Sequence, residues 1–498
     1  MVHNIMDNIK IGWSEKSIVP KGKKINLVGQ FYERISDVVE TPIAINALAI
    51  ECGDEAVIFC SCDLESTSHS LLEDVRKMLP KTFPKDKLII NAIHTHTSMG
   101  YAEVGDSLSN ALYGLKDFLP AEYMYKPLTS DDTPELLKPN EARAFLVERI
   151  ARAALEAWES RKEGYYATGF GRAAIGMCRR VCYDDGSAKM WGNANQANFT
   201  ELEAGNDSGI ELLFTYDLDK KLTGVVANVA CPAQVLEHQS FISSDYMGKT
   251  KALIREKYGD NVGFLGIISP AGDMCPRDMI RWVNSPVTLN DPNVSQDNKV
   301  IHKADPSMFD IKGANLAARR VATEIFWALD DVTEYIGESE LVHKTLYIDM
   351  PVRKVTIEEY EKSYKAISDF AKTCTGTINF EDNARMQIHS GIVSRYFLQQ
   401  TKDLFTIESH ILKLGNIAFA TNPFELFLDY GNQIRARSKA SQTFLIQLCC
   451  GAFGYLPTEK AEKGGHYSAF VGSGSAGHEG GNLLVRKTVQ EINEMFCD

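Results

Sequence analysis

The sequence predicts an α/β fold, because apolar, β-branched segments alternate with helical patterns along its 498 residues. Most of the apolar segments end in a cluster of Gly, Pro, Asp or His, which is typical of a strand that runs out into a polar loop. Apolar residues make up 44% of the chain and charged residues 24%, an ordinary globular composition. No Pro/Ser-rich linker or block of like charge interrupts the chain, so we expect one large domain.

Six segments predict strands, in chain order 56–63, 87–96, 224–232, 262–270, 416–423 and 443–455. Two segments predict helices, at 141–160 and 313–329. In the second helix Ala317, Val321, Ile325 and Leu329 recur every four residues, which places them on one face. Strand ends are where α/β proteins usually expose their chemistry, because the sheet holds the backbone while the loop presents side chains.

The charge and cysteine content limit the partners and the compartment. The formal net charge of −13 repels polyanions, so we expect a small-molecule substrate and no nucleic acid. No apolar run has the length of a signal peptide or a membrane span, so we expect a cytoplasmic protein without a membrane span; assembly into a homo-oligomer stays open. The 11 cysteines are an odd number without a disulfide-framework spacing, so we expect reduced thiols.

Two histidines stand one residue apart at the end of the segment 87–96. In an extended chain alternate residues point the same way, so His94 and His96 can face one pocket, as a metal ligand with a base beside it. Cys231, Glu425 and Tyr455 lie at the ends of other apolar segments. Imidazole, thiolate, carboxylate and phenol are all competent zinc donors, so the pattern favours a zinc site without proving that the four groups converge.

Five segments, in the same order, resemble signatures of the neutral ceramidase catalytic domain. They read HTHTSMGY (94–101), CP with FISSDYMG (231–248), GDMCPRD (272–278), NPFELF (422–427) and GYLPTEKA (454–461). The resemblance runs from residues 11–20 to the end. It implies a single large mixed-sheet domain over 1–498, with helices around central sheets and without the additional immunoglobulin-like domain of animal and bacterial ceramidases.

The resemblance also implies roles for particular residues. His94, Glu425 and Tyr455 would occupy three of four zinc-ligand positions, and His96 would lie beside the metal or face the substrate. Arg179 stands where the family has an arginine that helps to hold the substrate. Asp273 is expected to brace its loop by accepting hydrogen bonds from backbone N–H groups.

Two departures make the chain an atypical member of that family. Cys231 stands at the position of the second zinc histidine, and a thiolate there could keep the metal; His238 is a substitute ligand if Cys231 turns away. Cys275 stands at the position of the active-site serine. It keeps a nucleophile that ionises more readily, although inert packing is the alternative.

The expected function is therefore zinc-dependent hydrolysis of an amide in a small polar substrate, rather than in ceramide itself. A second interpretation is a zinc-thiolate glycoside hydrolase with a cysteine nucleophile, whose sugar pocket would use Trp191, Trp282, Arg277 and Asp278. A third is a relative that binds a ligand without turning it over. Fold analogy is weak evidence about the substrate, so these alternatives stay open at this point.

Overall fold

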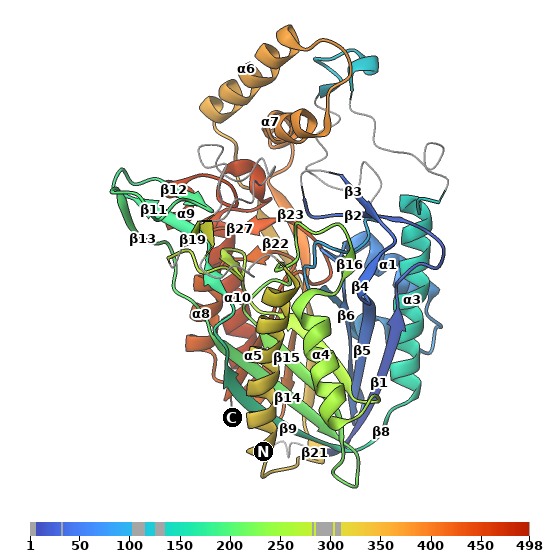
Figure 1. The fold of residues 1–498 in the computed structure, drawn as a ribbon. Helices are drawn as coiled ribbons and strands as arrows, with labels where there is room; N and C mark the ends of the chain where they lie inside the picture. Colours follow the sequence, from blue (N-terminus) through green and yellow to red (C-terminus); the bar gives the residue numbers. More distant parts are fainter. Residues whose placement is uncertain are drawn as a thin grey trace.

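The computed structural model describes residues 6–30, 33–101, 115–124, 135–280, 283–284, 302–303 and 310–497. Three larger sheets form the centre and helices surround them (Figure 1). The predicted α/β fold with mixed sheets is confirmed. Trp282, one of the expected sugar-pocket residues, lies outside the described residues.

The first sheet has the strand order β21-β1-β5-β6-β7, with β8 also paired to β1. These strands are β1 (Asp7–Ser17), β5 (Ala44–Cys52), β6 (Glu55–Cys62), β7 (Leu88–Ala92), β8 (Lys162–Glu163) and β21 (Glu338–Ser339). The second sheet, β17-β15-β14-β9, comprises β9 (Tyr165–Arg172), β14 (Gly209–Tyr216), β15 (Leu222–Val229) and β17 (Gly263–Ile268). The third sheet, β22-β23-β24-β26, comprises β22 (Leu341–Pro351), β23 (Leu404–Leu414), β24 (Ile417–Thr421) and β26 (Gln442–Ile446).

Each larger sheet is mostly antiparallel and contains one parallel pair that includes an edge strand. The three pairs are β6 with β7, β15 with β17, and β24 with β26. The carboxyl ends of two parallel strands lie at the same edge of a sheet, so each pair can present two loops together. Each of these six strands overlaps a segment for which the sequence predicts a strand, and the starts of β6, β15 and β26 differ from the prediction by one or two residues.

Short strands complete the sheet structure. They are β2 (Ile25–Leu27) with β3 (Arg34–Ser36), β4 (Val39–Thr41) with β16 (Ile242–Ser243), β10 (Met177–Cys178) with β18 (Met274–Cys275), β11 (Arg180–Tyr183) with β12 (Ala188–Met190) and β13 (Phe199–Leu202), β19 (Val283–Asn284) with β20 (His302–Lys303), and β25 (Glu425–Leu426) with β27 (Tyr455–Leu456).

Helices surround the sheets and also lie above them (Figure 1). They are α1 (His69–Met78), α3 (Pro139–Glu159), α4 (Asp245–Tyr258), α5 (Ile311–Asp330), α6 (Ile357–Thr373), α7 (Phe380–Leu398), α8 (Leu428–Arg437), α9 (Glu459–Gly464) and α10 (His478–Met495), with 3-10 turns η1 (Lys85–Lys87), η2 (Ala121–Tyr123) and η3 (Val471–Ser473). Helix α3 packs on β1 and β5, α5 on β9 and α4, and α10 on β22 and β23. Helices α6 and α7 pack on each other at the top of the view.

Local sequence explains where the two predicted helices begin. Pro139 stands at the first helical position of α3, and the Glu141 carboxylate accepts a hydrogen bond from the Lys138 N–H. The Asp310 side chain accepts from the Gly313 N–H and so caps α5. The face of α5 predicted from Ala317, Val321 and Ile325 is buried, which confirms that helix.

One core joins the three sheets. A single cluster of buried side chains includes Ile58 and Ile90 of the first sheet, Leu265 of the second, and Phe419 and Phe444 of the third. Because all three sheets pack into this core, their parallel pairs are held in fixed positions relative to one another. Among the described residues, no helix is both long enough and apolar enough to cross a bilayer.

Two predicted strands end earlier than expected. Strand β7 stops at Ala92, so His94 and His96 lie in the loop beyond it rather than in an extended chain. The segment 443–455 divides into β26 and β27, and the turn between them holds Leu448 and Cys450 at positive φ (54° and 56°). Apolar patterning cannot reveal such turns, because it does not report backbone conformation.

Candidate active site

Backbone hydrogen bonds join the ends of the three parallel strand pairs. The Ala92 N–H donates to the Leu448 carbonyl over 3.2 Å, which links the end of β7 to the segment after β26. The Ala233 N–H donates to the Ile93 carbonyl, also over 3.2 Å, and links the loop after β15 to the same place. Loops from all three sheets therefore meet at one edge of the core.

Gln447 fixes two of these loops with one side chain. Its Oε1 atom accepts hydrogen bonds from the Ala271 N–H (3.0 Å) and the Leu426 N–H (3.1 Å), and the residue is buried. It therefore ties the loop after β17 to the strand that carries Glu425. Sequence reasoning missed this role, and the only signal was one polar residue inside the apolar run 443–450.

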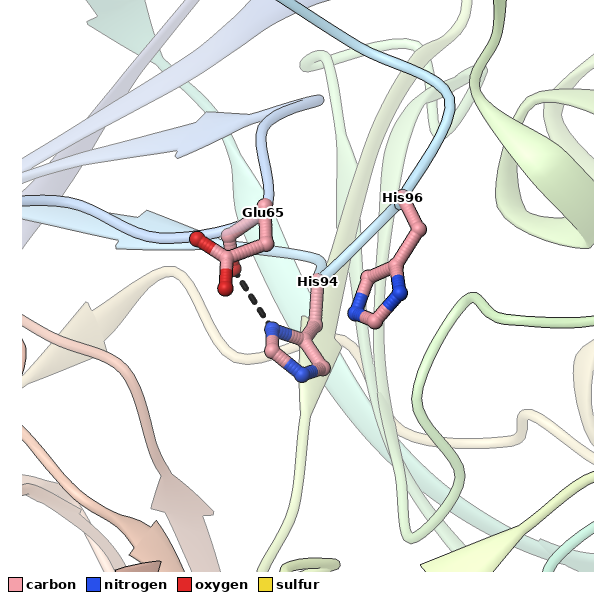
Figure 2. Close-up of side chains that lie close together, drawn as sticks. All are labelled: Glu65, His94 and His96. Carbon is pink, nitrogen blue, oxygen red and sulfur yellow. Dashed lines mark hydrogen bonds between the residues drawn. The ribbon is translucent and has the colours of Figure 1, made fainter. Parts of the chain in front are cut away.

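His94 occupies a left-handed turn (φ 64°) and is 4% exposed. Its Nδ1 atom lies 2.6 Å from the carbonyl oxygen of Glu65, which can only accept, so Nδ1 carries a proton (Figure 2). Its Nε2 atom lies 3.3 Å from Oε2 of Glu425. Burial by itself lowers the pKa of His94, but the Glu425 carboxylate outweighs burial and raises that pKa to about 9.

Glu425 and Tyr455 are direct partners across a short parallel pair. They stand opposite each other in β25 and β27, and the Glu425 N–H donates to the Gly454 carbonyl. Burial raises the pKa of Tyr455 well above its ordinary value, and the neighbouring Glu425 carboxylate, to which the phenol is hydrogen-bonded, adds to this. The two sequence motifs 422–427 and 454–461 thus place an acid and a phenol together.

Arg179 lies next to Tyr455 and is 2% exposed. Its Nη2 atom donates to the Tyr455 hydroxyl (3.2 Å) and to the Gly272 carbonyl (3.0 Å), while its backbone N–H donates to the Asp273 carbonyl. Burial opposes its charge, but Tyr455 and Glu425 outweigh burial and raise the pKa of Arg179. The guanidinium therefore stays positive beside the phenol.

His96 lies next to His94, with the two rings edge to face and their centroids 4.9 Å apart (Figure 2). The Nε2 atom of His96 is 2.7 Å from the amide nitrogen of Gln234, and its Nδ1 atom is 3.6 Å from a carboxylate oxygen of Glu237. Burial, with the charge of His94, holds the pKa of His96 well below its ordinary value. The His96 imidazole is therefore neutral, and its Nδ1 atom also lies 3.3 Å from the amide nitrogen of Gln30.

The donor atoms of Glu65, His94 and His96 all lie within 4.8 Å of one another (Figure 2). Glu65 follows β6 and was not expected from the sequence, although an acid soon after an apolar strand is the same signal that points to the other residues. The His94–Glu425 pair adds a fourth donor close to His94. An imidazole nitrogen and carboxylate oxygens are ligands that suit zinc.

Cys231 and His238 stand apart from this group. The Cys231 side chain is fully buried, and its Sγ atom donates to the carbonyls of Ile175 (3.4 Å) and Pro232 (3.5 Å). The Nε2 atom of His238 lies 3.3 Å from a carboxylate oxygen of Glu237. Within the described part of the chain, neither residue belongs to a set of three donors with His94, so the identity of a fourth ligand stays a prediction.

Cys275 and Asp273 lie in the loop after β17. The Cys275 side chain is fully buried and its Sγ atom donates to the Arg277 carbonyl over 3.4 Å. Burial raises the pKa of Cys275 to about 11, although Arg277 and Arg179 act in the opposite direction. The Asp273 carboxylate accepts from the Leu428 N–H (2.8 Å), a backbone brace of the kind expected, and burial raises its pKa to about 7.

A cavity of about 760 Å³ lies next to the candidate active site. Glu65, Glu425 and Tyr455 are among the residues that line it. Helix α7 also lines the cavity, through residues that include Ile388, Gly391 and Leu398. A volume in this range holds a small molecule. Another hollow of about 720 Å³, between α4 and α5, touches none of these residues.

Comparisons with known proteins support the fold. Neither protein-family models nor curated sequences match the chain. A solved structure of neutral ceramidase from Pseudomonas aeruginosa is similar, with a TM-score of 0.66, 14% identity, 98% of this chain covered and 74% of that chain. A ceramidase complexed with C2 gives a TM-score of 0.64, 12% identity, 98% of this chain and 76% of the other. The chain therefore has the neutral ceramidase-like fold that its five motifs predict.

Proposed function

We propose that the chain is a zinc-dependent hydrolase that cleaves an amide bond in a small polar substrate. The observation that carries this proposal is the His94 Nε2 to Glu425 Oε2 contact of 3.3 Å, next to Tyr455 and beside the cavity of about 760 Å³. The whole chain would act as one catalytic domain in the cytoplasm.

The residues at this place fit a zinc ion. The Glu65 carbonyl holds the proton of His94 on Nδ1, which leaves Nε2 to face the Glu425 carboxylate. Two acceptors that face each other need a proton or a metal ion between them, and zinc accepts imidazole, carboxylate and phenol oxygen together. His94, Glu425 and Tyr455 would hold the ion, with Cys231 or His238 as the further predicted ligand.

A zinc ion held there would supply Lewis acidity toward the substrate carbonyl. His96, which is neutral and lies beside His94, would face the substrate as a hydrogen-bonding group. Arg179 would keep Tyr455 oriented through its hydrogen bond and add a positive charge near the developing oxyanion. Cys275, with its raised pKa, suits a proton donor better than a nucleophile.

Among the described residues of the expected sugar pocket, the Arg277 guanidinium lies over the Trp191 ring, 4.0 Å from its centroid, but the groups needed for glycoside cleavage are engaged elsewhere. That reaction needs a thiolate nucleophile and a carboxylic acid that faces the substrate, whereas the Cys275 Sγ atom donates to the Arg277 carbonyl and the Asp273 carboxylate accepts from the Leu428 N–H. A panel of amide and glycoside substrates, read for released amine or released reducing sugar, tests the choice. Release of amine alone is expected; release of sugar, or no turnover with zinc bound, would refute the proposal.

The matched variants for this assay are Glu425→Gln, which removes a ligand charge, and Glu491→Gln. Glu491, on α10, forms an ion pair with Lys344 of β22 and does not line the cavity. Zinc content and amine release should fall together in the first variant and stay unchanged in the second. Equal loss in both variants would point to a general effect on folding instead of the site.

A further inference from the structure

A second group of unlike donors lies in the third sheet. It consists of Glu408 and His410 on β23 and Cys450 in the turn after β26, with all three donor atoms within 4.8 Å of one another. The three residues are buried, with relative exposures of 4%, 0% and 2%. None of them is among the residues of the candidate active site.

The hydrogen bonds around His410 require more protons than two neutral imidazoles can supply. His343 Nδ1 lies 2.9 Å from the Ala56 carbonyl, His343 Nε2 lies 2.9 Å from His410 Nδ1, and His410 Nε2 lies 2.9 Å from Glu408 Oε1. The groups at the two ends of this row of hydrogen bonds, the Ala56 carbonyl and the ionised Glu408 carboxylate, can only accept. Each of the three contacts needs a hydrogen atom or a cation between its two acceptor atoms, but two neutral imidazoles carry only two N–H groups.

The third bridge can be a proton or a metal ion. Arg76 donates hydrogen bonds to both carboxylate oxygens of Glu408, which favours the ionised form of this residue. With two N–H groups used toward Ala56 and between the rings, the His410 Nε2 lone pair faces the Glu408 carboxylate.

We propose that Glu408, His410 and Cys450 bind a zinc ion that takes the place of the missing proton. Imidazole and thiolate ligands select zinc over magnesium or calcium, and three protein ligands leave a fourth position for water. Zinc would link β23 to the turn after β26. In the same turn the Leu448 carbonyl accepts a hydrogen bond from the Ala92 N–H, two residues before His94. The site would therefore stabilise the edge on which the candidate active site is built.

Two neighbouring residues make the hydrogen bonds to Glu408 and His410 that residues around a metal site usually make to its ligands. His343 would fix the His410 tautomer, as the second ring nitrogen of a metal-binding histidine is normally hydrogen-bonded. Arg76 donates to both Glu408 oxygens, at 2.5 Å and 2.9 Å, and orients the carboxylate. Burial raises the pKa of Cys450 to about 12, so metal binding would release the thiol proton.

The cavity gives an ion access to this group. His69 and Gly451 line the cavity of about 760 Å³, and His69 Nδ1 lies 3.9 Å from Glu408 Oε2. His69 is itself exposed, with 54% of its side chain accessible. The His69 side chain therefore stands between the cavity and the Glu408 carboxylate.

Zinc stoichiometry of the full-length protein tests the proposal. The wild type should bind two zinc ions, His94→Ala one, Cys450→Ser one, and the double variant none. Cys449→Ser is the matched control, because Cys449 is the neighbouring buried thiol outside the donor group, and it should bind as the wild type does. If only the first proposal fails, the wild type binds a single ion that Cys450→Ser loses and His94→Ala keeps.

Cobalt substitution provides a readout that does not depend on the Cys450→Ser variant folding. In Cys231→Ser, any thiolate-to-cobalt charge-transfer band must come from a cysteine other than Cys231. We expect this band to be present in Cys231→Ser and in the Cys231→Ser/Cys449→Ser double variant, and absent in the Cys231→Ser/Cys450→Ser double variant. A Cys231→Ser protein without the band, or a zinc content unchanged by Cys450→Ser, would overturn the proposal and leave a shared proton between His410 and Glu408.

Discussion

His94 lies in the loop after β7 and Glu425 lies in the short β25–β27 pair, yet Nε2 of the first residue lies 3.3 Å from Oε2 of the second. The contact depends on the left-handed turn at His94 and on the parallel pair that sets Glu425 opposite Tyr455. It is the relationship on which the proposed chemistry depends, and it leads to the following predictions.

Replacing Glu425 with Gln should remove most of the zinc and most of the activity. The amide keeps the size of the side chain but loses the charge that pairs with His94. Changes to outer partners of metal ligands already reduce affinity or activity about 10- to 100-fold, so we expect a loss beyond roughly 100-fold for a ligand. Amine release and zinc content measure it; full activity with reduced zinc would contradict the assignment.

The stability of chelator-treated protein should depend on His94 and on pH. The Glu425 carboxylate outweighs burial and raises the pKa of His94 from 6.5 to about 9. The pair therefore stabilises the fold fully below about pH 6.5, and this contribution is lost as the pH rises through about 9. The shift corresponds to about 3 kcal/mol at most.

Urea unfolding of the wild type and His94→Gln measures this effect as a difference between the two proteins. The difference should be largest near about pH 6 and should shrink toward about pH 10, because the wild-type imidazole then loses its proton. In the Glu425→Gln background the same His94 substitution should show little pH dependence. A difference that stays constant with pH would show that Glu425 does not raise the pKa of His94.

Cys275 should react slowly with iodoacetamide at neutral pH. Burial raises its pKa to about 11, whereas a free thiol has a pKa near 8.5, so its thiolate fraction is lower by more than about 100-fold. The exposed Cys497 provides the internal comparison in a mass-spectrometric time course. Cys275→Ser should keep activity within about tenfold as a hydroxyl donor; abolished turnover, or a covalent adduct on Cys275, would support a cysteine nucleophile.

Gln447→Leu should destabilise the protein strongly. It leaves the N–H groups of Ala271 and Leu426 without their acceptor, and each buried unsatisfied group costs about 1–3 kcal/mol, so the sum is about 2–6 kcal/mol. Gln490→Leu is the control, since Gln490 is exposed and bonds only to Glu494 within the described residues. Denaturant midpoints measure both variants; similar values would show that Gln447 does not tie the loops together.

Much of the fold could be predicted from the sequence, because strand and helix patterns are local. The six predicted strands overlap all six members of the parallel pairs, and the buried face of α5 follows the spacing of Ala317, Val321 and Ile325. The turns at His94 and Cys450 could not be predicted, because positive φ in a non-glycine residue is imposed by tertiary contacts.

Some residues of the candidate site could be predicted from the sequence and others could not. His94, Glu425 and Tyr455 were accessible through short motifs at strand ends, and the structure brings these three together. Glu65 and Gln447 were missed, because their roles depend on contacts between segments far apart in the chain. The orientation of Cys231 could not be read either, since a buried thiol near a strand end looks the same whether or not it faces a metal.

The most direct test of the account is anomalous diffraction at the zinc edge from crystals grown with zinc. The account predicts a peak between His94 Nε2 and the Glu425 carboxylate, within bonding distance of both and next to Tyr455. Ordered density with those two side chains hydrogen-bonded directly to each other, and no anomalous peak there, would contradict it.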